Sequence, residues 1–381
     1  MKDTIVVGAG PAGTLAARSM AEKGYDVLVL ENHQVAGLPQ HCTGLISPET
    51  LEMSRVNPDI LNTISNAEFV FPNGRSFTVN SKTKKAVIVD RADLDQKMAD
   101  AAQDAGAVFS YSTRYDSHTV KDAVFVDSDR ATFKARSIVG ADGASSKVAM
   151  TLGDNKPREY VRGIQADVAY RMENQDTMKI FIGNSVAPGF FQWQIPCGDF
   201  TRIGLCTSWN AGSPSEYLTQ KLISMNLHDK VQKVYSGKIP LGGRQFVSGD
   251  RCLLTGDAAG FVKPMSGGGL YPAFKANQHL VSVLSSCLDA ETMASKDMAE
   301  YSRRCDEDFG RELDHDYKFR RRYKKMTDRD FNRIYKYVIM NNLAPRLEEI
   351  DIDHPLSVVR SAIYGPKVII SGIPIMLRML I

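Results

Sequence analysis

The sequence predicts an α/β protein with one parallel sheet, one antiparallel sheet and a helical C-terminal region. Three observations support this prediction. Near the start, an apolar strand, a glycine-rich turn and a helix follow one another, which is the order of a β-α-β unit. The middle third alternates apolar and polar residues, as half-buried antiparallel strands do. From about residue 291 onward, the patterns indicate helices.

The first element is an apolar strand, Thr4–Val7, that runs directly into a turn with three glycines. Gly8, Gly10 and Gly13 have the G-x-G-x-x-G spacing, and a helix follows at once. In this motif the first glycine permits the tight turn, and the second lets a pyrophosphate approach the backbone. The third lets helix and strand pack closely. Ala12 lies at the helix start, where open N–H groups favour phosphates.

The second strand, Asp26–Leu30, ends at an acidic residue, Glu31. Glu31 follows Gly13 at roughly the ~20-residue distance at which a carboxylate binds a ribose hydroxyl. A glycine motif alone is weak evidence for a ligand. Strand, glycines, helix, second strand and acid together predict a Rossmann-like domain that binds a dinucleotide.

Composition restricts the class of protein. The chain has 381 residues, enough for two or three domains, and a formal net charge of +3. This charge is too small to imply nucleic acid, and no basic run interleaves with aromatic residues as a stacking surface would require. The six cysteines include no C-x-x-C pair, which argues against a metal site or a disulfide scaffold.

The expected location is the cytoplasm, with peripheral contact to a membrane as an addition. Scattered cysteines suit a reducing compartment. The first strand begins at Thr4, which leaves no room for a cleavable signal peptide. No run approaches the ~20 apolar residues that span a bilayer.

A loop rich in glycine, proline and small polar residues follows Glu31 and extends to Ser47. It leaves the carboxyl end of the second strand, where such sheets bind their ligands. Cys42 lies in the middle of this loop, followed by Thr43 and Gly44. We therefore expect the loop to reach across the ligand site.

Three later strands also end near this edge of the sheet. Val87–Asp90 leads into Arg91 and a helix from about Ala92 to Ala105, so that Arg91 can reach the pyrophosphate. Ser137–Gly140 leads into Ala-Asp-Gly, and a strand ending at Leu254 leads into Gly256-Asp257. A glycine run and a helix over about Leu270–Leu288 follow.

The predicted domains are discontinuous. Segments with alternating patterns, such as Gly163–Tyr170, Thr177–Ile182 and Phe191–Pro196, interrupt the nucleotide-binding pattern and predict a second sheet beside it. We assign residues 1–65, 91–154 and 241–288 to the nucleotide-binding domain, 66–90 and 155–240 to the antiparallel sheet, and 289–381 to the helical region.

These junctions resemble the FAD-dependent family of p-hydroxybenzoate hydroxylase, which shares its nucleotide-binding fold type with glutathione reductase. The family's marks are an N-terminal G-x-G-x-x-G, a middle Asp-Gly and a late Gly-Asp, here at Gly8, Asp142 and Gly256. The resemblance implies FAD as cofactor and Asp257 as a ligand of the ribityl chain. The cofactor-binding residues it implies are Gly8, Gly10, Ala12, Gly13, Glu31, Cys42, Thr43, Gly44, Arg91, Arg114, Asp257, Gly268, Gly269 and Leu270.

Within this superfamily the chain is similar to the geranylgeranyl reductases, and among them to the archaeal digeranylgeranylglycerophospholipid reductases. The loop His41–Ser47 is similar to the Cys-containing loop of that family. The segment Ala187–Pro196 resembles its Tyr-x-Trp-x-Phe-Pro motif, with Phe191 for the Tyr and Ile195 for the Phe. These two departures leave the substrate and its chain length open.

The resemblance implies saturation of isoprenoid C=C bonds by a hydride from reduced flavin and a proton. Phe191 and Trp193 are the expected substrate wall, although such residues also form sheet cores, which is the expectation for Phe190 and Ile195. Cys42 is the candidate catalytic residue. Its thiol either donates the proton or, like many free cysteines, fills a gap as a small apolar group.

Two other functions remain compatible with the same motifs. One is an NAD(P)H-dependent aromatic monooxygenase with FAD and a compact polar pocket. The other is a non-catalytic, flavin-stabilised carrier of prenyl lipids. The sequence has no second G-x-G-x-x-G, so the electron donor is open between NAD(P)H, a ferredoxin and another reduced carrier.

An isoprenoid lipid substrate would have to be taken from a membrane. The basic run Lys318–Lys325 and the apolar segment Lys367–Ile381 together predict reversible binding to an anionic surface. The alternatives are a solvated helix face for the basic run and ordinary core for the apolar segment.

Overall fold

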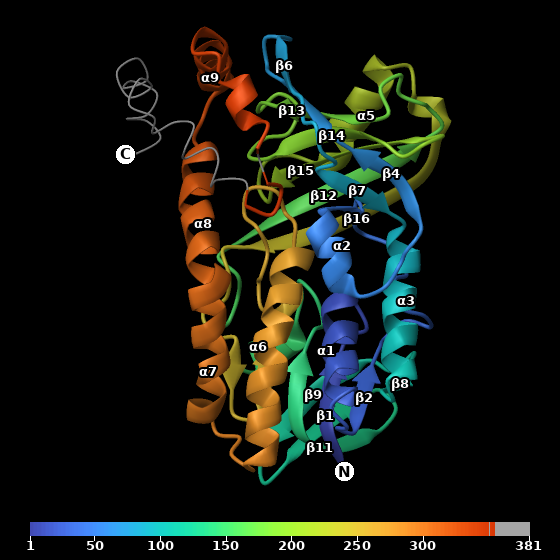
Figure 1. Ribbon diagram of the computed structural model, residues 1–381, viewed down its shortest axis with the longest axis vertical. Helices are drawn as coiled ribbons and strands as arrows, with labels where there is room; N and C mark the ends of the chain where they lie inside the picture. The colour runs from blue at the N-terminus through green and yellow to red at the C-terminus, as the bar shows by residue number, and fades with distance from the viewer. Residues whose placement is uncertain (350, 355–381) are drawn as a thin grey trace.

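The computed structural model describes residues 1–349 and 351–354 (Figure 1). It has two lobes, each built around a sheet, and long helices that run beside the lower lobe. The N-terminus lies at the far end of the lower lobe (Figure 1). The fold class is the expected one: an α/β nucleotide-binding lobe, an antiparallel sheet and a helical C-terminal region.

The sheet of the lower lobe has eight strands, and its central strands are parallel. Its main path has the order β17-β18-β11-β1-β2-β8, and a hairpin of β9 and β10 extends from β11. Val7 at the end of β1 pairs with both Leu30 and Gly140, so three strands end together. The bounds are β1 Lys2–Val7, β2 Val27–Leu30, β8 Val108–Ser110, β9 Tyr115–Val120, β10 Val124–Ser128, β11 Thr132–Gly140, β17 Ser248–Gly249 and β18 Cys252–Leu254.

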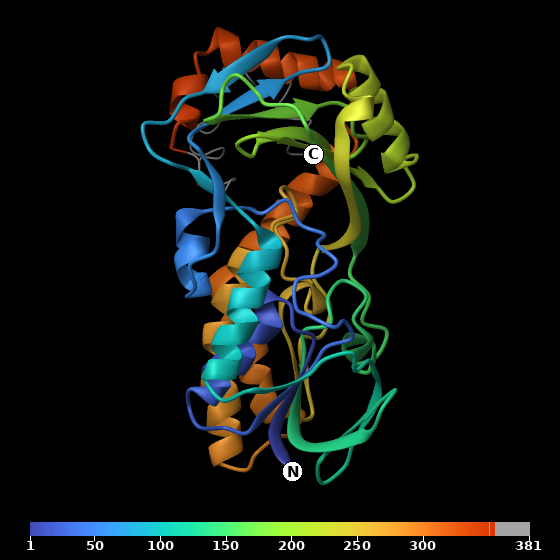
Figure 2. The same cartoon turned by 90° about the vertical axis from the view of Figure 1, so that its right-hand side faces the viewer.

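Helices α1, α3, α6 and α7 lie together on one side of this sheet (Figure 2). Their bounds are α1 Pro11–Ala21, α3 Arg91–Asp104, α6 Leu270–Asp289 and α7 Ser295–Cys305. α1 packs between α3 and α6, and α7 packs on α6. α3 begins one residue earlier than expected because the Asp90 carboxylate accepts the Ala92 N–H at 2.9 Å and caps the helix.

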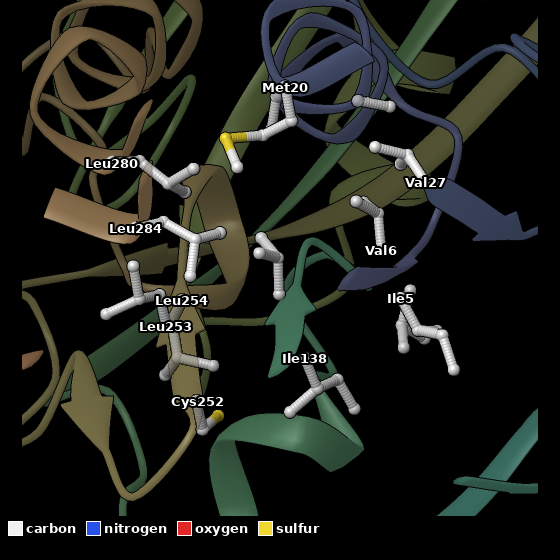
Figure 3. Close-up of a cluster of buried hydrophobic side chains, with 14 of the residues drawn as sticks. Ile5, Val6, Met20, Val27, Ile138, Cys252, Leu253, Leu254, Leu280 and Leu284 are labelled. Atoms are coloured by element: carbon white, nitrogen blue, oxygen red, sulfur yellow. The ribbon is translucent and has the colours of Figure 1, made fainter. Parts of the chain in front are cut away.

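The core of the lower lobe fills the space between these helices and the central strands (Figure 3). Ile5, Val6 and Ile138 from the strands and Leu280 and Leu284 from α6 are each fully buried. Because parallel strands are covered on both faces, their sequences are continuous apolar runs, as Thr4–Val7 is.

The sheet of the upper lobe has seven strands in the order β16-β12-β15-β14-β13-β5-β6. Neighbours are antiparallel except β13 and β5, which are parallel. Helix α5, Pro214–Ser224, packs against β12 and β15. The strand bounds are β5 Asn66–Val70, β6 Ser76–Val79, β12 Glu159–Val168, β13 Thr177–Ile182, β14 Phe191–Pro196, β15 Thr201–Ser208 and β16 Val231–Leu241.

A small third sheet lies between the lobes. It has the order β3-β7-β4, with bounds β3 Leu45–Ile46, β4 Ile60–Ile64 and β7 Ala86–Val89. Of the predicted segment 66–90, therefore, β5 and β6 belong to the large antiparallel sheet, whereas β7 joins the small one. Two short helices precede strands of the upper sheet in the chain: α2, Pro48–Ser54, comes before β5, and α4, Lys147–Met150, comes before β12.

The helical C-terminal region connects the two lobes. α7 continues through a π-helical turn, Asp306–Gly310, into α8, Arg311–Tyr323, so that one long rod runs upward beside α6 (Figure 1). α9, Asp328–Met340, and the short helix η4, Ala344–Leu347, then reach the upper sheet near β6. Within residues 1–349 and 351–354, no helix is long and apolar enough to span a bilayer.

Candidate FAD site and adjoining cavity

The glycine turn between β1 and α1 is tightly packed on one side and open on the other. A Cβ on Gly8, whose φ is +104°, would lie 2.4 Å from the Ala141 carbonyl oxygen. A Cβ on Gly13 would lie 2.0 Å from the Gly8 oxygen, whereas one on Gly10 would meet nothing within 4 Å. Gly10 thus faces open space at the N-terminus of α1, which is suitable for a phosphate.

Glu31 is held at the end of β2, directly beside this turn. One carboxylate oxygen accepts the Ala9 N–H at 2.8 Å, and the other accepts the His33 N–H at 2.9 Å. The His33 Nδ1 lies 2.6 Å from the second oxygen. These contacts fix the carboxylate while leaving lone pairs for a ribose hydroxyl. Sequence reasoning assigned no role to His33.

Asp257 follows Gly256 in a short 3-10 turn, where a Gly256 Cβ would lie 2.8 Å from the Ala12 Cβ. Its carboxylate lines the cavity and accepts no hydrogen bond from any residue the structure describes. Burial raises the pKa of Asp257 to about 6, against the opposing charges of Arg91 and Arg244. A ribityl hydroxyl at this position would supply the missing donor, so the carboxylate fits the expected cofactor.

Arg91 is the first residue of α3 and is buried. Its guanidinium forms a two-point ion pair with Asp95, with nitrogen–oxygen distances of 3.0 and 3.1 Å. It also interacts with the Cys42 thiol. Asp95, one turn along α3, was not predicted, although the i, i+4 spacing of Arg and Asp is a visible signal.

The loop that contains Cys42 packs closely on strand β7. Gly44 has φ +79°, and a Cβ there would lie 2.3 Å from the Val89 oxygen. The Val89 N–H donates to the Gly44 oxygen at 2.9 Å. The Cys42 thiol is half-buried, lines the cavity and lies 3.5 Å from the Gly44 nitrogen. Position 44 therefore requires glycine, because any side chain there would clash with the Val89 carbonyl oxygen.

The upper sheet holds the same loop from the other side. Thr43 Oγ1 donates to the Gln165 side chain at 3.0 Å, and Arg202 donates to the Thr43 oxygen at 2.5 Å. Arg202 is buried and pairs with Asp167 at 2.7 and 2.9 Å, and Tyr235 also donates to Asp167 at 2.9 Å. None of these four supporting residues was predicted, because their relation to the loop is purely tertiary.

The glycine run before α6 forms the third wall of the site. Gly268 and Gly269 and the first residue of α6, Leu270, all line the cavity. The Gly269 Cβ position lies 2.9 Å from an Asp257 carboxylate oxygen. Lys263, which was not predicted, lies beside Gly268 and is buried in an ion pair of 2.6 Å with Asp353.

One continuous cavity of about 840 Å³ joins these parts and extends far beyond them. It begins at the glycine turn, passes Cys42, Arg91 and Asp257, and follows the face of the upper sheet toward α9. Phe191 and Trp193 line it, as expected. Phe190 and Ile195 also line it but are 2% and 3% exposed, consistent with the expected core role.

Five predicted cofactor residues are not part of the cavity lining: Gly8, Gly13, Glu31 and Gly44, which are close in sequence or in space to residues that line it, and Arg114, which lies apart. The Arg114 side chain is 61% exposed and pairs with Asp116 at 3.3 Å. Its backbone N–H donates to the Asp129 carboxylate at 2.9 Å. A cofactor contact of Arg114 stays a prediction.

Comparison with known proteins gives the class of this protein. The open glycine turn, the fixed Glu31 carboxylate and the unpartnered Asp257 carboxylate fit the parts of a flavin dinucleotide. The chain belongs to the FAD binding domain family, whose model matches residues 1–308. FAD is its cofactor, and the protein is a flavin-dependent oxidoreductase.

Several relatives carry the same protein name and are similar to this chain over most of their length. A protein of Methanocella arvoryzae named digeranylgeranylglycerophospholipid reductase is 28% identical, with 87% of this chain and 89% of that protein covered. Digeranylgeranylglycerophospholipid reductase 2 of Methanopyrus kandleri is 29% identical, with 87% and 88% covered. The corresponding protein of Methanocaldococcus jannaschii is 28% identical, with 92% of each covered.

Solved structures show the same fold. A geranylgeranyl bacteriochlorophyll reductase-like protein of Thermoplasma acidophilum superposes with a TM-score of 0.85 at 20% identity, covering 98% of this chain and 99% of that one. The halogenase PltM in complex with phloroglucinol and FAD gives a TM-score of 0.69 at 18% identity, covering 94% and 85%.

We expect the substitutions Glu31→Ala and Asp257→Asn each to weaken FAD binding. Glu31→Ala removes both acceptor oxygens, and Asp257→Asn replaces one carboxylate oxygen by an NH2 group that donates and removes the charge. Losing an acceptor for a buried cofactor hydroxyl typically costs about 1–3 kcal/mol. The measurement is the FAD dissociation constant of the refilled apoprotein, followed by flavin fluorescence. Lys121→Ala is the matched control, since this lysine is exposed and does not line the cavity, and it should bind FAD as the wild type does. Full FAD affinity in Asp257→Asn would contradict the assignment.

The raised pKa of Asp257 also predicts a pH-dependent stability of the apoprotein. An ordinary Asp titrates near 3.9, so between about pH 4 and pH 6 the folded state binds more protons than the unfolded state. The free energy of unfolding should therefore fall as the pH rises through this range. Asp257→Asn removes this fall and should be more stable than wild type by about 1–3 kcal/mol at pH 7, but equal at pH 4. Urea unfolding at both pH values tests this, and equal stability at pH 7 would contradict it.

Proposed function

We propose that this protein saturates C=C bonds of geranylgeranyl chains in membrane-lipid precursors of the archaeal type. The observation that supports this most strongly is the shape of the cavity. It continues from the FAD site as a long apolar passage rather than closing into a small pocket. The reductase names of the curated relatives support the same reaction.

The wall of the passage suits a branched hydrocarbon chain. One face of the upper sheet supplies aliphatic and aromatic side chains, among them Met178, Ile180 and Phe69. At the far end, Phe331, Ile334 and Val338 of α9 line the cavity. Burial of a prenyl chain here removes apolar surface from water, at about 25 cal/mol per Å².

Reduced FAD, when bound, supplies a hydride for such a reaction, and the protein supplies orientation, exclusion of water and a proton. Cys42 is the proposed proton donor. Its thiol lies in the cavity wall and interacts with the Arg91 guanidinium. Thr43 and Gly44 fix the loop on both sides of the site, so the Sγ atom has a defined position.

The alternatives predict a different cavity or a different outcome. An aromatic monooxygenase needs a compact polar pocket, whereas this cavity is long and mostly apolar. A non-catalytic prenyl-lipid carrier would bind the same lipid but never reoxidise the reduced protein. NAD(P)H, a ferredoxin and another reduced carrier remain the candidate electron donors, and the rate of anaerobic flavin bleaching with each distinguishes them.

We expect Cys42→Ser to keep FAD and lipid but to transfer reducing equivalents more slowly. A positioned general acid contributes typically about 10²–10⁴-fold, and the serine hydroxyl is a far weaker acid than a thiol. The measurement is the rate at which geranylgeranyl lipid reoxidises dithionite-reduced protein under anaerobic conditions. The mass of the lipid product should rise by two hydrogens for each C=C bond that is reduced. The matched control is Cys197→Ser, a buried cysteine outside the cavity lining. Wild-type rates in Cys42→Ser would mean that another group donates the proton.

We also propose that the protein docks peripherally on anionic membranes. Of the expected basic run, Lys318, Arg321 and Lys325 are exposed, but not every member is. Arg320 does not lie on a solvated face: it is 1% exposed and pairs with Glu159 at 2.8 Å. Lys324 binds the same carboxylate at 3.0 Å. The apolar segment Lys367–Ile381 lies outside the described residues.

Exposed cations also continue along α9. Arg329, Arg333 and Lys336 are exposed at helical spacing on one face, and Ile339 and Met340 beside them are 48% and 84% exposed. The other face of α9 lines the far end of the cavity. A membrane bound to this helix would therefore lie next to the passage, which suits a lipid substrate.

The triple substitution of Arg329, Arg333 and Lys336 by Glu should abolish flotation with anionic liposomes at low salt. Each basic residue near such a surface contributes about 1 kcal/mol, and salt screens the attraction. The matched control replaces the exposed Lys23, Lys121 and Lys296 of the lower lobe by Glu, with an equal change of charge. Equal loss of binding in both triple variants would attribute docking to net charge alone and contradict a role for α9.

A further inference from the structure

One row of paired residues crosses the upper sheet from the FAD site to its far edge. Tyr235, Gln165, Gly204 and Trp193 are neighbours on adjacent strands. The row continues through Ile180, Phe69 and Phe77. Directly paired residues of neighbouring strands point to the same face. Apart from Gly204, every member lines the cavity, so this row is the floor of the passage.

Gly204 brings the two polar members of this floor together. A Cβ at this position would lie 2.5 Å from the Gln165 Cβ and 2.7 Å from the Trp193 Cε2, the ring atom bonded to Nε1. The Trp193 Cζ2 would be closer still, at 2.6 Å, so the indole lies over Gly204, beside the Gln165 side chain. Any larger residue at position 204 would separate the two side chains.

Both side chains have a buried nitrogen without a partner. Gln165 is 3% exposed, and its Oε1 accepts from Thr43 while its Nε2 has no acceptor among the residues the structure describes. The buried Trp193 Nε1 likewise has no acceptor in residues 1–349 and 351–354. A buried donor without a partner is costly and rare, so two of them side by side in one cavity wall indicate an acceptor from a ligand.

We propose that Gln165 and Trp193 form a subsite for an oxygen atom at the polar end of the prenyl substrate: an ether, ester or hydroxyl oxygen. This inference rests on the proposed function, because a prenyl hydrocarbon itself offers no acceptor. With the oxygen at this subsite, the chain runs over Ile180 and Phe69 toward α9. The double bond nearest the oxygen then lies beside the loop of Cys42, which Gln165 contacts through Thr43.

The test measures binding to the oxidised holoenzyme, so it needs no turnover. The two probes are geranylgeraniol and the matched C20 prenyl hydrocarbon without oxygen, in the same detergent. Gln165→Leu and Trp193→Phe should each weaken geranylgeraniol binding about 5–10-fold, as the loss of one hydrogen bond does, and change hydrocarbon binding less than about 2-fold. Ile180→Ala is the control, and it should weaken both probes equally.

Two results would overturn the subsite. One is an equal loss for both probes in Gln165→Leu and Trp193→Phe, which would make these residues ordinary wall. The other is a variant that changes the flavin absorption spectrum or the FAD affinity but leaves the ratio of the two probes' dissociation constants unchanged. That result would mean that the two N–H groups bind the cofactor. If the probe selectivity holds but reduced protein is never reoxidised by lipid, the reductase proposal fails while the oxygen subsite stands.

Discussion

The site depends on one constraint: the loop around Cys42 must be held at once by the small third sheet and by the upper sheet. From below, β7 fixes it by a backbone hydrogen bond to Gly44 that leaves no room for a Cβ. From above, Arg202 and Gln165 bind the main chain and side chain of Thr43. The cofactor region and the apolar passage meet at this loop, so the distance between cofactor and substrate is set by how closely the two lobes approach here.

Two buried ion pairs maintain this approach. Arg202 and Asp167 lie behind the loop, and Lys263 and Asp353 tie the chain after η4 to the glycine run before α6. Removing charges from water is expensive, and such pairs often add little net stability. Their directional hydrogen bonds, however, define one geometry. We therefore expect the ion pairs to matter for geometry more than for stability. Each holds one wall of the cavity in a defined place, which non-directional apolar contacts alone would not do.

The cavity changes character along its length, and this order suits the proposed chemistry. Charged groups, among them Asp257 and Arg91, line the cofactor end, where hydroxyls and phosphates of FAD would lie. Two N–H donors, on Gln165 and Trp193, mark the transition, and mostly hydrocarbon and aromatic surface follows along the sheet, with a few polar side chains such as Asn66 and Ser81. A lipid with a polar end and a prenyl chain matches this order in one orientation. Complementarity of this kind selects the bond that reaches the cofactor.

The sequence by itself determined the nucleotide-binding half, because its signals are local. The spacing of Gly8, Gly10 and Gly13 specifies a backbone conformation, and Glu31 follows at the end of the next strand. Gln165 and Arg202 carry no such signal. They lie in ordinary alternating strands, and their roles arise only when the upper sheet folds over the Cys42 loop. Likewise, the basic run around residue 320 appears uniformly solvated until packing buries Arg320 against Glu159. Local geometry is encoded by neighbours in sequence, whereas partners distant in the chain are decided by tertiary packing.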